Sequence, residues 1–198
     1  GYPGTKVVYA APDIEDYEMA DGQGLQQAIR ILKDHNPKKT GAPLFLAYGI
    51  YRPHPPMIVP KKHWDAIDIS KYKLPYVTHG INYAHAYYAS IHFVDDLAGK
   101  LVAELKKEGL ADNTIVVFTG DQGFHLGEHG HWHKSTMFEQ ACRVPLIIVD
   151  PRQKEKGVQC TNLTGLIDIY PTLCDLIGIE PPHKLSGLSL KAQLNDVT

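Results

Sequence analysis

Three short apolar runs constrain the fold of this chain more than any other feature of its sequence. They occupy residues 43–50, 113–120 and 144–150. Short, continuous apolar runs of this kind are typical of strands that are buried on both faces. Segments with helical periodicity separate or follow them, and strands that alternate with helices favour a parallel sheet with both faces covered. The sequence therefore predicts an α/β fold with a mainly parallel sheet flanked by helices.

The helices are predicted from apolar residues that recur every three or four positions. Helical periodicity covers residues 21–35, 135–141 and 168–178, and a longer segment covers 80–108. At 1.5 Å per residue the longest helix extends about 40 Å. Its apolar face is predicted to contain Ile91, Val94, Leu97, Ala98, Leu101 and Leu105.

The composition excludes several classes of function. The chain has 20 Lys and Arg residues against 22 Asp and Glu, a formal net charge of −2, and the cations are scattered. No basic stripe is therefore available to attract nucleic acid or an anionic membrane. The longest apolar run, residues 44–51, is far shorter than the ~20 residues of a membrane-spanning helix. The three cysteines lack C-x-x-C spacing, so neither a disulfide framework nor a thiolate zinc site is indicated.

The loop after the second apolar run combines glycines with a high density of ionisable side chains. In open α/β sheets, functional groups collect at the carboxyl ends of the strands. Asp121 and Gln122 stand at such an end and offer a carboxylate and an amide oxygen, which are ligands suited to Ca²⁺ or Mg²⁺. Gly123 allows a tight backbone turn after them. The same residues are also compatible with an aspartate that only caps a turn.

The histidines of this loop are His125, His129, His131 and His133. Their spacing differs from H-E-x-x-H, and the glycines between them oppose the helix that this zinc motif requires. A histidine zinc site is therefore disfavoured. We interpret the histidines as polar loop residues rather than metal ligands, with His125, His131 and His133 facing a substrate. A histidine can carry partial positive charge near neutral pH, which suits contact with an anion.

A second polar loop follows the first apolar run and has the sequence Arg-Pro-His-Pro-Pro, residues 52–56. Its prolines impose an extended, fixed shape. His54 can serve there as a positioned donor or acid, and Lys134, after the histidine loop, can present a cation to an oxyanion. Either residue alone is also compatible with a solvated or structural role. Because both loops follow predicted strands, we expect Asp121, Gln122, His54 and Lys134 to share one site.

Together, these segments resemble the type I sulfatases of the alkaline phosphatase superfamily, in particular iduronate-2-sulfatase-like enzymes. The resemblance is carried by "PLFLAYGIYRPHPP", by "YYASIHFVDDLAGKLVAELKKEGLADNTIVVFTG", by "FTGDQGFHLGEHGHWHKSTMFEQACRVPLII", and by "LIDIYPTLCDLIGI" followed by "GLSL". It covers most of the chain, and the order and spacing of these separate motifs make it specific. It implies an alkaline-phosphatase-like sulfatase domain that hydrolyses sulfate esters.

The resemblance also implies a role for each candidate residue. Asp121 and Gln122 match positions that bind Ca²⁺ in the family, with Mg²⁺ as the weaker alternative. Lys134 matches a lysine that contacts the sulfate, and His54 matches a histidine that contacts the sulfate or the leaving-group oxygen. The family nucleophile is a formylglycine hydrate, and the implied partner is a sulfated carbohydrate or a small sulfate ester. Family members of this kind are periplasmic, secreted or lysosomal.

One family motif is missing from residues 1–198. Formylglycine arises from Cys or Ser in C/S-x-P-x-R, and no cysteine or serine of this chain stands in that motif. We therefore interpret 1–198 as a partial sulfatase catalytic domain, truncated at the N-terminus and at the C-terminus, and expect the chain alone to be inactive. The connection between Pro75 and Gly80 is also shorter than in relatives. Asn162 begins a sequence that fits a glycosylation acceptor.

Two other functions are compatible with the same residues. A phosphodiesterase or phosphonate hydrolase of the superfamily shares the fold and the metal loop, and a catalytically dead homologue can bind a sulfated glycan without turnover. The upstream sequence separates the enzymes, because C/S-x-P-x-R indicates a sulfatase, whereas a Thr or Ser nucleophile without that motif indicates phosphoryl chemistry. Neither the identity of the substrate nor the oligomeric state follows from the sequence.

Overall fold

The structure is a computed structural model that describes residues 8–74, 80–154 and 156–195. Residues 75–79, where the connection was expected to be short, lie outside the described residues. None of the helices within the described ranges is long and apolar enough to cross a membrane.

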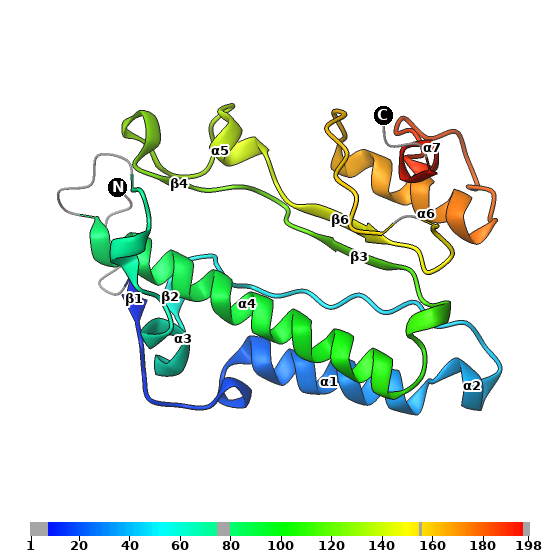
Figure 1. Ribbon diagram of the computed structural model, residues 1–198, viewed down its shortest axis with the longest axis horizontal. Coiled ribbons are helices and arrows are strands. Elements are labelled where there is room, and N and C mark those ends of the chain that lie inside the picture. Colours follow the sequence, from blue (N-terminus) through cyan, green and yellow to red (C-terminus); the bar gives the residue numbers. More distant parts are fainter. Residues whose placement is uncertain (1–7, 75–79, 155, 196–198) are drawn as a thin grey trace. The chain divides into compact units, whose positions relative to one another are not determined.

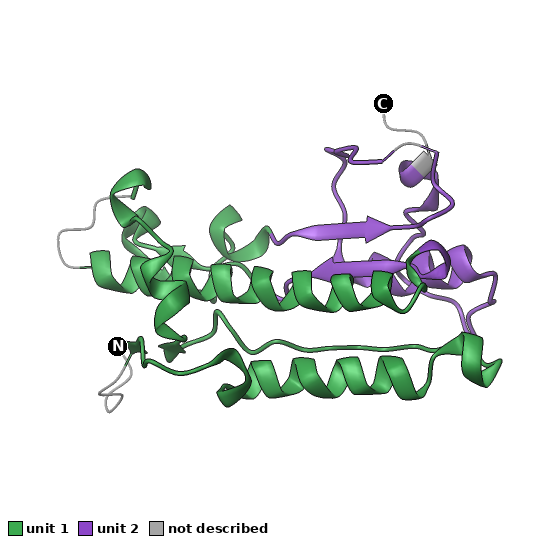
Figure 2. Ribbon diagram, turned by 60° about the horizontal axis from the view of Figure 1, so that its bottom comes forward, with its two compact units in different colours: residues 1–111, 122–143 green, residues 112–121, 144–198 purple. Residues whose placement is uncertain are grey.

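The chain divides into two compact units (Figure 2). Unit 1 consists of residues 1–111 and 122–143, and unit 2 consists of residues 112–121 and 144–198. The segment 122–143, which carries the histidine loop, therefore belongs to unit 1, whereas the strand that precedes it belongs to unit 2.

Two long helices form the centre of unit 1 (Figure 1). They are α1, Ala20–Asp34, and α4, Ile81–Lys107, so the predicted helices at 21–35 and 80–108 are confirmed. The short helix α3, Lys61–Asp65, packs on α4. The buried apolar core of the unit contains Met19, Leu25, Val59, Ala89, Phe93 and Leu97. Removing such side chains from water is the main favourable contribution to folding, at about 25 cal/mol per Å² of apolar surface.

The face that α4 buries agrees with the predicted one in the C-terminal half of the helix and differs from it in the N-terminal half. Leu97 and Leu105 are buried as expected, but Ile91 is 42% exposed. The fully buried apolar positions are Ala84, Ala86, Ala89, Phe93 and Leu97. Apolar residues lie on more than one side of this helix, so periodicity alone cannot select the buried side. The packing of α1 and α3 against the helix selects it.

The only parallel strand pair among the described residues lies in unit 1 and is short. β1, Tyr9–Ala10, pairs with β2, Met57–Ile58, in the register Tyr9↔Met57. Residues 43–50 pair with no described strand, so the predicted first strand is wrong. The segment is extended and alternates between half-buried and exposed positions, with Phe45 82% exposed. An apolar run becomes a strand only where a neighbouring backbone offers hydrogen bonds, which local sequence does not report.

The remaining elements of unit 1 include a small hairpin in the histidine loop. β4, His125–Leu126, pairs antiparallel with β5, Trp132–His133, in the register His125↔His133. The short helix α5, Glu139–Cys142, covers part of the predicted segment 135–141. The other short helical elements of the unit are η1 Asp16–Glu18, α2 Pro37–Thr40, η2 Ile69–Lys71, η3 Ala111–Asn113, which begins in this unit, and η4 Glu128–Gly130.

Unit 2 contains the two other predicted strands and the last predicted helix. β3, Val116–Thr119, pairs antiparallel with β6, Leu146–Val149, in the register Val116↔Val149. α6, Ile169–Ile177, follows η5, Leu166–Asp168, and ends at Gly178, whose φ of 73° is the left-handed conformation that glycine adopts without strain. α7 spans Lys191–Asn195. Both strands and the helix at 168–178 are confirmed.

The mainly parallel sheet is not confirmed. Among the described residues, β1 and β2 are parallel, whereas the pairs β3–β6 and β4–β5 are antiparallel. The physical reason is that a continuous apolar run reports burial, and burial is the same whichever way the neighbouring strand runs. Strand direction depends on the route of the chain between strands, which periodicity does not contain.

Candidate active site

The loop that carries His54 is held by a buried carboxylate of α1. Asp21, in the first turn of that helix, accepts the Tyr51 N–H through Oδ1 at 2.8 Å. Its Oδ2 lies 3.7 Å from Arg52 Nη1, and both side chains are largely buried. Arg52 Nε in turn donates to the Ile58 carbonyl at 2.9 Å. These contacts tie the start of the loop to the helix and to β2.

His54 itself is exposed within unit 1. Its Nδ1 lies 2.7 Å from the Pro55 carbonyl oxygen, and its ring centroid lies 4.8 Å from that of Tyr51. A carbonyl oxygen can only accept, so the hydrogen of this bond belongs to Nδ1. Nε2 is therefore the atom of His54 that remains for an external ligand, as an acceptor when the ring is neutral and as a donor when it is protonated.

Gln122 begins the polar loop in unit 1, and Asp121 is the last residue of the preceding unit 2 segment. Both side chains are exposed and form no hydrogen bond with the residues that the structure describes. Gly123 follows and donates its N–H to the Ala141 carbonyl at 2.9 Å. A Cβ at Gly123 would lie 2.1 Å from the Gln140 carbonyl oxygen, so only glycine permits this close approach. The shared site of Asp121 and His54 stays a prediction, since the two residues belong to different units.

The histidines of the loop have different environments. His125 is fully buried, and its Nε2 lies 2.7 Å from Thr136 Oγ1. His129 and His131 are exposed and lie against the Phe138 ring, with centroid distances of 4.4 Å and 5.7 Å. The burial of His125 does not fit the predicted contact with substrate, because its side chain offers no surface to a ligand. The exposed side chain of His131, in contrast, is accessible to a ligand.

His133 is partly enclosed by neighbouring side chains. Partial burial lowers the pKa of His133, and the positive charge that His54 can carry lowers it further. The Tyr83 hydroxyl lies 3.3 Å from His133 Nδ1, and the Phe124 ring centroid lies 5.5 Å from that of His133. Burial raises the pKa of Tyr83 to about 12, so this hydroxyl keeps its proton near neutral pH.

Lys134 follows His133 directly and is half-buried. Within residues 8–74, 80–154 and 156–195, its ammonium group has no hydrogen-bond or ion-pair partner. The residues on either side, His133 and Ser135, have φ of 70° and 73°. A left-handed conformation costs a non-glycine residue on the order of 1–2 kcal/mol, and such strain tends to occur at functional sites. The cation is therefore unneutralised and held on an unusual backbone.

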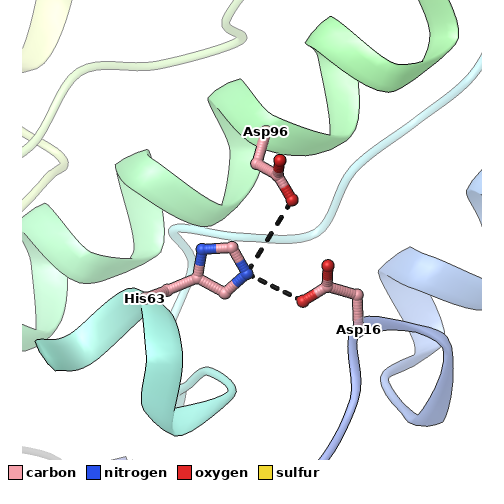
Figure 3. A group of neighbouring side chains, drawn as sticks. All are labelled: Asp16, His63 and Asp96. Atoms are coloured by element: carbon pink, nitrogen blue, oxygen red, sulfur yellow. Dashed lines mark hydrogen bonds and ion pairs between the residues drawn. The ribbon is translucent and has the colours of Figure 1, made fainter. Parts of the chain in front are cut away.

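A separate group of possible metal ligands lies deeper in unit 1 (Figure 3). Asp16, His63 and Asp96 form the only such group of three among the described residues. His63 Nε2 lies 2.7 Å from Asp16 Oδ1 and 3.9 Å from Asp96 Oδ2. Lys100 Nζ lies 2.6 Å from Asp16 Oδ2 and 2.6 Å from Asp96 Oδ2, and Lys62 Nζ lies 2.8 Å from Asp16 Oδ2.

The charges of this group are already balanced by protein side chains. Burial by itself would raise the pKa of Asp16, but hydrogen bonds from Lys100, Lys62 and His63 outweigh it and hold that pKa below its ordinary range. The donor set includes a ring nitrogen and lies against two ammonium groups, whereas Ca²⁺ prefers a cage of oxygen ligands. The group therefore fits an ion-pair network better than a calcium site.

Comparison with known proteins identifies the family. A family model described as "Sulfatase" matches residues 1–179. The chain belongs to the sulfatase family. Among curated relatives, this sulfatase-family chain is 41% identical over 114 residues to N-acetylglucosamine-6-O-sulfatase of Bacteroides thetaiotaomicron, a match that covers 58% of the chain and 20% of that relative. It is 27% identical over 247 residues to human iduronate 2-sulfatase, covering 92% of the chain and 44% of the relative.

Solved structures agree with this assignment. A protein in complex with its substrate D-glucosamine-2-N,6-O-disulfate is 41% identical, with a TM-score of 0.55 over 58% of this chain and 23% of that one. Phosphonate monoester hydrolase of Agrobacterium radiobacter is 26% identical, with a TM-score of 0.75 over 93% of this chain and 44% of that one. The sulfatase-family chain thus has the fold of the alkaline phosphatase superfamily and spans less than half the length of these proteins.

Sequence reasoning found the exposed polar residues of the sulfatase-family chain and missed those that support them. Thr136 and Tyr83 were not singled out, and neither was the Asp16 network. Asp16 and His63 are 47 positions apart, so no local spacing connects them. The prolines around His54 and the glycine at 123 were the available signals, since each marks a backbone held in a special position.

Proposed function

We propose that this chain supplies one wall of the active site of a sulfuric ester hydrolase that acts on a sulfated carbohydrate. The observation that carries the proposal is the ammonium of Lys134, a half-buried residue directly beside His133; among the described residues this ammonium has no hydrogen-bond or ion-pair partner. Groups that carry or can acquire positive charge thus lie near one another in one unit. A sulfate ester presents oxygens that such groups can bind, and the resulting charge-assisted hydrogen bonds are worth roughly 1.5–3 kcal/mol each.

In this proposal each side chain has a distinct task. Lys134 binds a sulfate oxygen and stabilises the negative charge that develops on it. His54 binds through Nε2 to the sulfate or to the leaving-group oxygen, and donates a proton there when protonated. His131 and His133 bind the anionic carbohydrate beside the ester. His125 cannot take part directly because it is buried.

Asp121 and Gln122 are the proposed metal ligands. Their exposed carboxylate and amide oxygens suit Ca²⁺, and Mg²⁺ less well, because Ca²⁺ accepts 6–8 oxygen ligands in flexible geometry. Two side chains cannot complete such a shell, so further ligands must come from other residues of the full-length protein. A bound Ca²⁺ would help to neutralise the sulfate oxygens. The formylglycine nucleophile would also come from outside the matched motifs of this chain.

The names of the relatives support a substrate class for this proposal. An N-acetylglucosamine-6-O-sulfatase and a structure holding a disulfated glucosamine favour a sulfated amino sugar, and iduronate 2-sulfatase favours a sulfated uronic acid. The phosphonate monoester hydrolase is a specific observation in favour of a second candidate, hydrolysis of a phosphonate or phosphate ester by the same superfamily fold. A homologue that binds a sulfated glycan without turnover is the third.

One experiment separates these candidates. The full-length protein is assayed with glucosamine-6-sulfate, a 2-sulfated uronic disaccharide, an aryl sulfate and an aryl phosphonate monoester, as wild type and as Lys134→Ala. We expect a sulfated carbohydrate to have the highest kcat/KM and Lys134→Ala to lower it by about 10- to 100-fold. Preference for the phosphonate would establish the second candidate. Binding of the sulfated sugars without turnover would establish the third.

A further inference from the structure

His125 occupies a position that a substrate contact cannot explain. Its side chain is fully buried, and it is polar. Nε2 lies 2.7 Å from Thr136 Oγ1, whereas Nδ1 is buried and has no hydrogen-bond partner among the described residues. An orphaned N–H costs more than an orphaned lone pair, so the ring hydrogen belongs to Nε2, which donates to the threonine. The only hydrogen-bond donor of the neutral ring is therefore used in the bond to Thr136.

Thr136 stands two residues after Lys134, at the end of the strained stretch. His133 and Ser135, on either side of the lysine, have left-handed φ of 70° and 73°. The start of this stretch is fixed by the β4–β5 ladder, in which His133 is the register partner of His125. Its end is fixed by Thr136, whose Oγ1 contacts His125 Nε2 and also lies 3.4 Å from the Phe138 N–H. His125 therefore restrains the lysine segment from both sides.

We propose that His125 is a positioning residue for Lys134. Through its backbone pairing with His133 and its hydrogen bond to Thr136, it holds the segment 133–136, in which His133 and Ser135 have left-handed φ, and so sets the direction of the Lys134 side chain. Without the side-chain bond, the segment relaxes toward ordinary backbone conformations and the ammonium loses its fixed position. This inference rests on the proposed function only in giving Lys134 an oxyanion to bind.

A purely structural role predicts a different behaviour. A buried imidazole with one unsatisfied nitrogen contributes less to stability than an apolar side chain of similar size would. His125→Leu should therefore leave the thermal midpoint unchanged or raise it, while binding of the oxyanion weakens. If His125 acted only in the core, the same substitution would leave the affinity of the folded protein for the oxyanion unchanged.

The test uses the full-length protein, with inorganic sulfate as the probe, measured as the inhibition constant against an aryl sulfate and by calorimetric binding. Lys134→Ala gives the loss of sulfate affinity that follows when the ammonium group is absent, and the other variants are compared with it. We expect His125→Leu and Thr136→Val to weaken sulfate binding by about five- to ten-fold, and His125→Gln and Thr136→Ser, which keep a donor and an acceptor, to stay within about two-fold of wild type. In the Lys134→Ala background, His125→Leu should have no further effect, because the group it positions is absent.

The outcomes are distinguishable. If Lys134→Ala leaves sulfate binding unchanged, the proposed function fails and the positioning role fails with it. If Lys134→Ala weakens binding but His125→Leu and Thr136→Val do not, or if their effects add fully to that of Lys134→Ala, only the positioning role is overturned. Should His125→Leu not fold, Thr136→Val carries the test, since it removes the same hydrogen bond at a half-buried position.

Discussion

At the scale of single residues, the His54 loop depends on the carboxylate of Asp21. We predict that Asp21→Ala lowers the free energy of unfolding by about 3 kcal/mol, the usual cost of removing one partner of a buried pair. It leaves the buried Arg52 guanidinium without its carboxylate and the Tyr51 N–H without its acceptor. Turnover should fall as well, because His54 loses its anchor. Urea denaturation and steady-state kinetics measure the two effects.

The matched control is Asp13→Ala, which removes an exposed carboxylate from the segment before α1. It should change the free energy of unfolding by less than about 0.5 kcal/mol, as is usual for surface substitutions. Equal effects of the two substitutions would show that the Asp21 contacts do not hold the loop.

The roles of the polar loop residues give a second prediction. In the full-length protein, Asp121→Ala should remove bound Ca²⁺, because it deletes a carboxylate ligand. His131→Ala and His133→Ala should instead raise KM or lower kcat for the sulfated substrate and leave the metal content unchanged. Metal analysis of each purified variant decides the matter. Loss of stoichiometric metal from either histidine variant, or zinc in the wild-type protein, would revive a histidine metal site.

At the scale of elements, the Asp16 network joins three segments of unit 1. Asp16 belongs to η1, His63 to α3, and Lys100 to α4. The contact of Asp16 with Lys100 spans 84 positions of sequence. The network thus holds η1 against α3 and α4. The stability that it contributes depends on which of its groups are charged.

The pKa shifts of this network give a pH prediction. The pKa of Asp16 is lower in the folded state than its ordinary value of 3.8, so the unfolded chain binds more protons below that pH. Burial lowers the pKa of His63 below 6.5, although Asp16 opposes the shift, so the unfolded chain also binds more protons just below pH 6.5. Stability therefore falls as pH drops, first below 6.5 through His63 and then below 3.8 through Asp16.

Urea unfolding from pH 3 to pH 8 measures this dependence. Asp16→Asn should abolish the loss of stability below pH 3.8. It should also lower stability at neutral pH, because it leaves the ammonium groups of Lys62 and Lys100 without their shared carboxylate. His63→Gln should make stability independent of pH between the pKa of His63 in the folded protein and pH 6.5. If both variants kept the pH profile of the wild type, the network would not be the source of the pH dependence of stability.

At the scale of the whole molecule, this chain holds the proposed oxyanion-binding side chains without the C/S-x-P-x-R motif. We predict that residues 1–198 alone do not hydrolyse an aryl sulfate or a sulfated uronic disaccharide, whereas the full-length protein does so with Ca²⁺. The reason is that binding groups stabilise a transition state only when a nucleophile is present to form it. Turnover by residues 1–198 alone, free of contaminating sulfatase, would contradict this division of roles.

The sequence by itself determined the features that depend on neighbouring residues. Helices α1 and α4 and strands β3 and β6 were predicted close to their observed bounds, because periodicity and chain breakers act within a few positions. The motifs around His54 and Asp121 were enough to recognise the sulfatase family. Residue type and local backbone thus carried the identity of the chain and its exposed polar groups.

The tertiary structure decided everything that depends on residues distant in sequence. Residues 43–50 read as a strand, yet they have no described strand partner, and β3 runs antiparallel to β6. His125 has the same sequence features as its neighbours in the loop, yet it is buried and bonded to Thr136. Strand pairing, burial and ion pairing are set by which surfaces meet after folding, and a linear pattern of residue types does not contain that information.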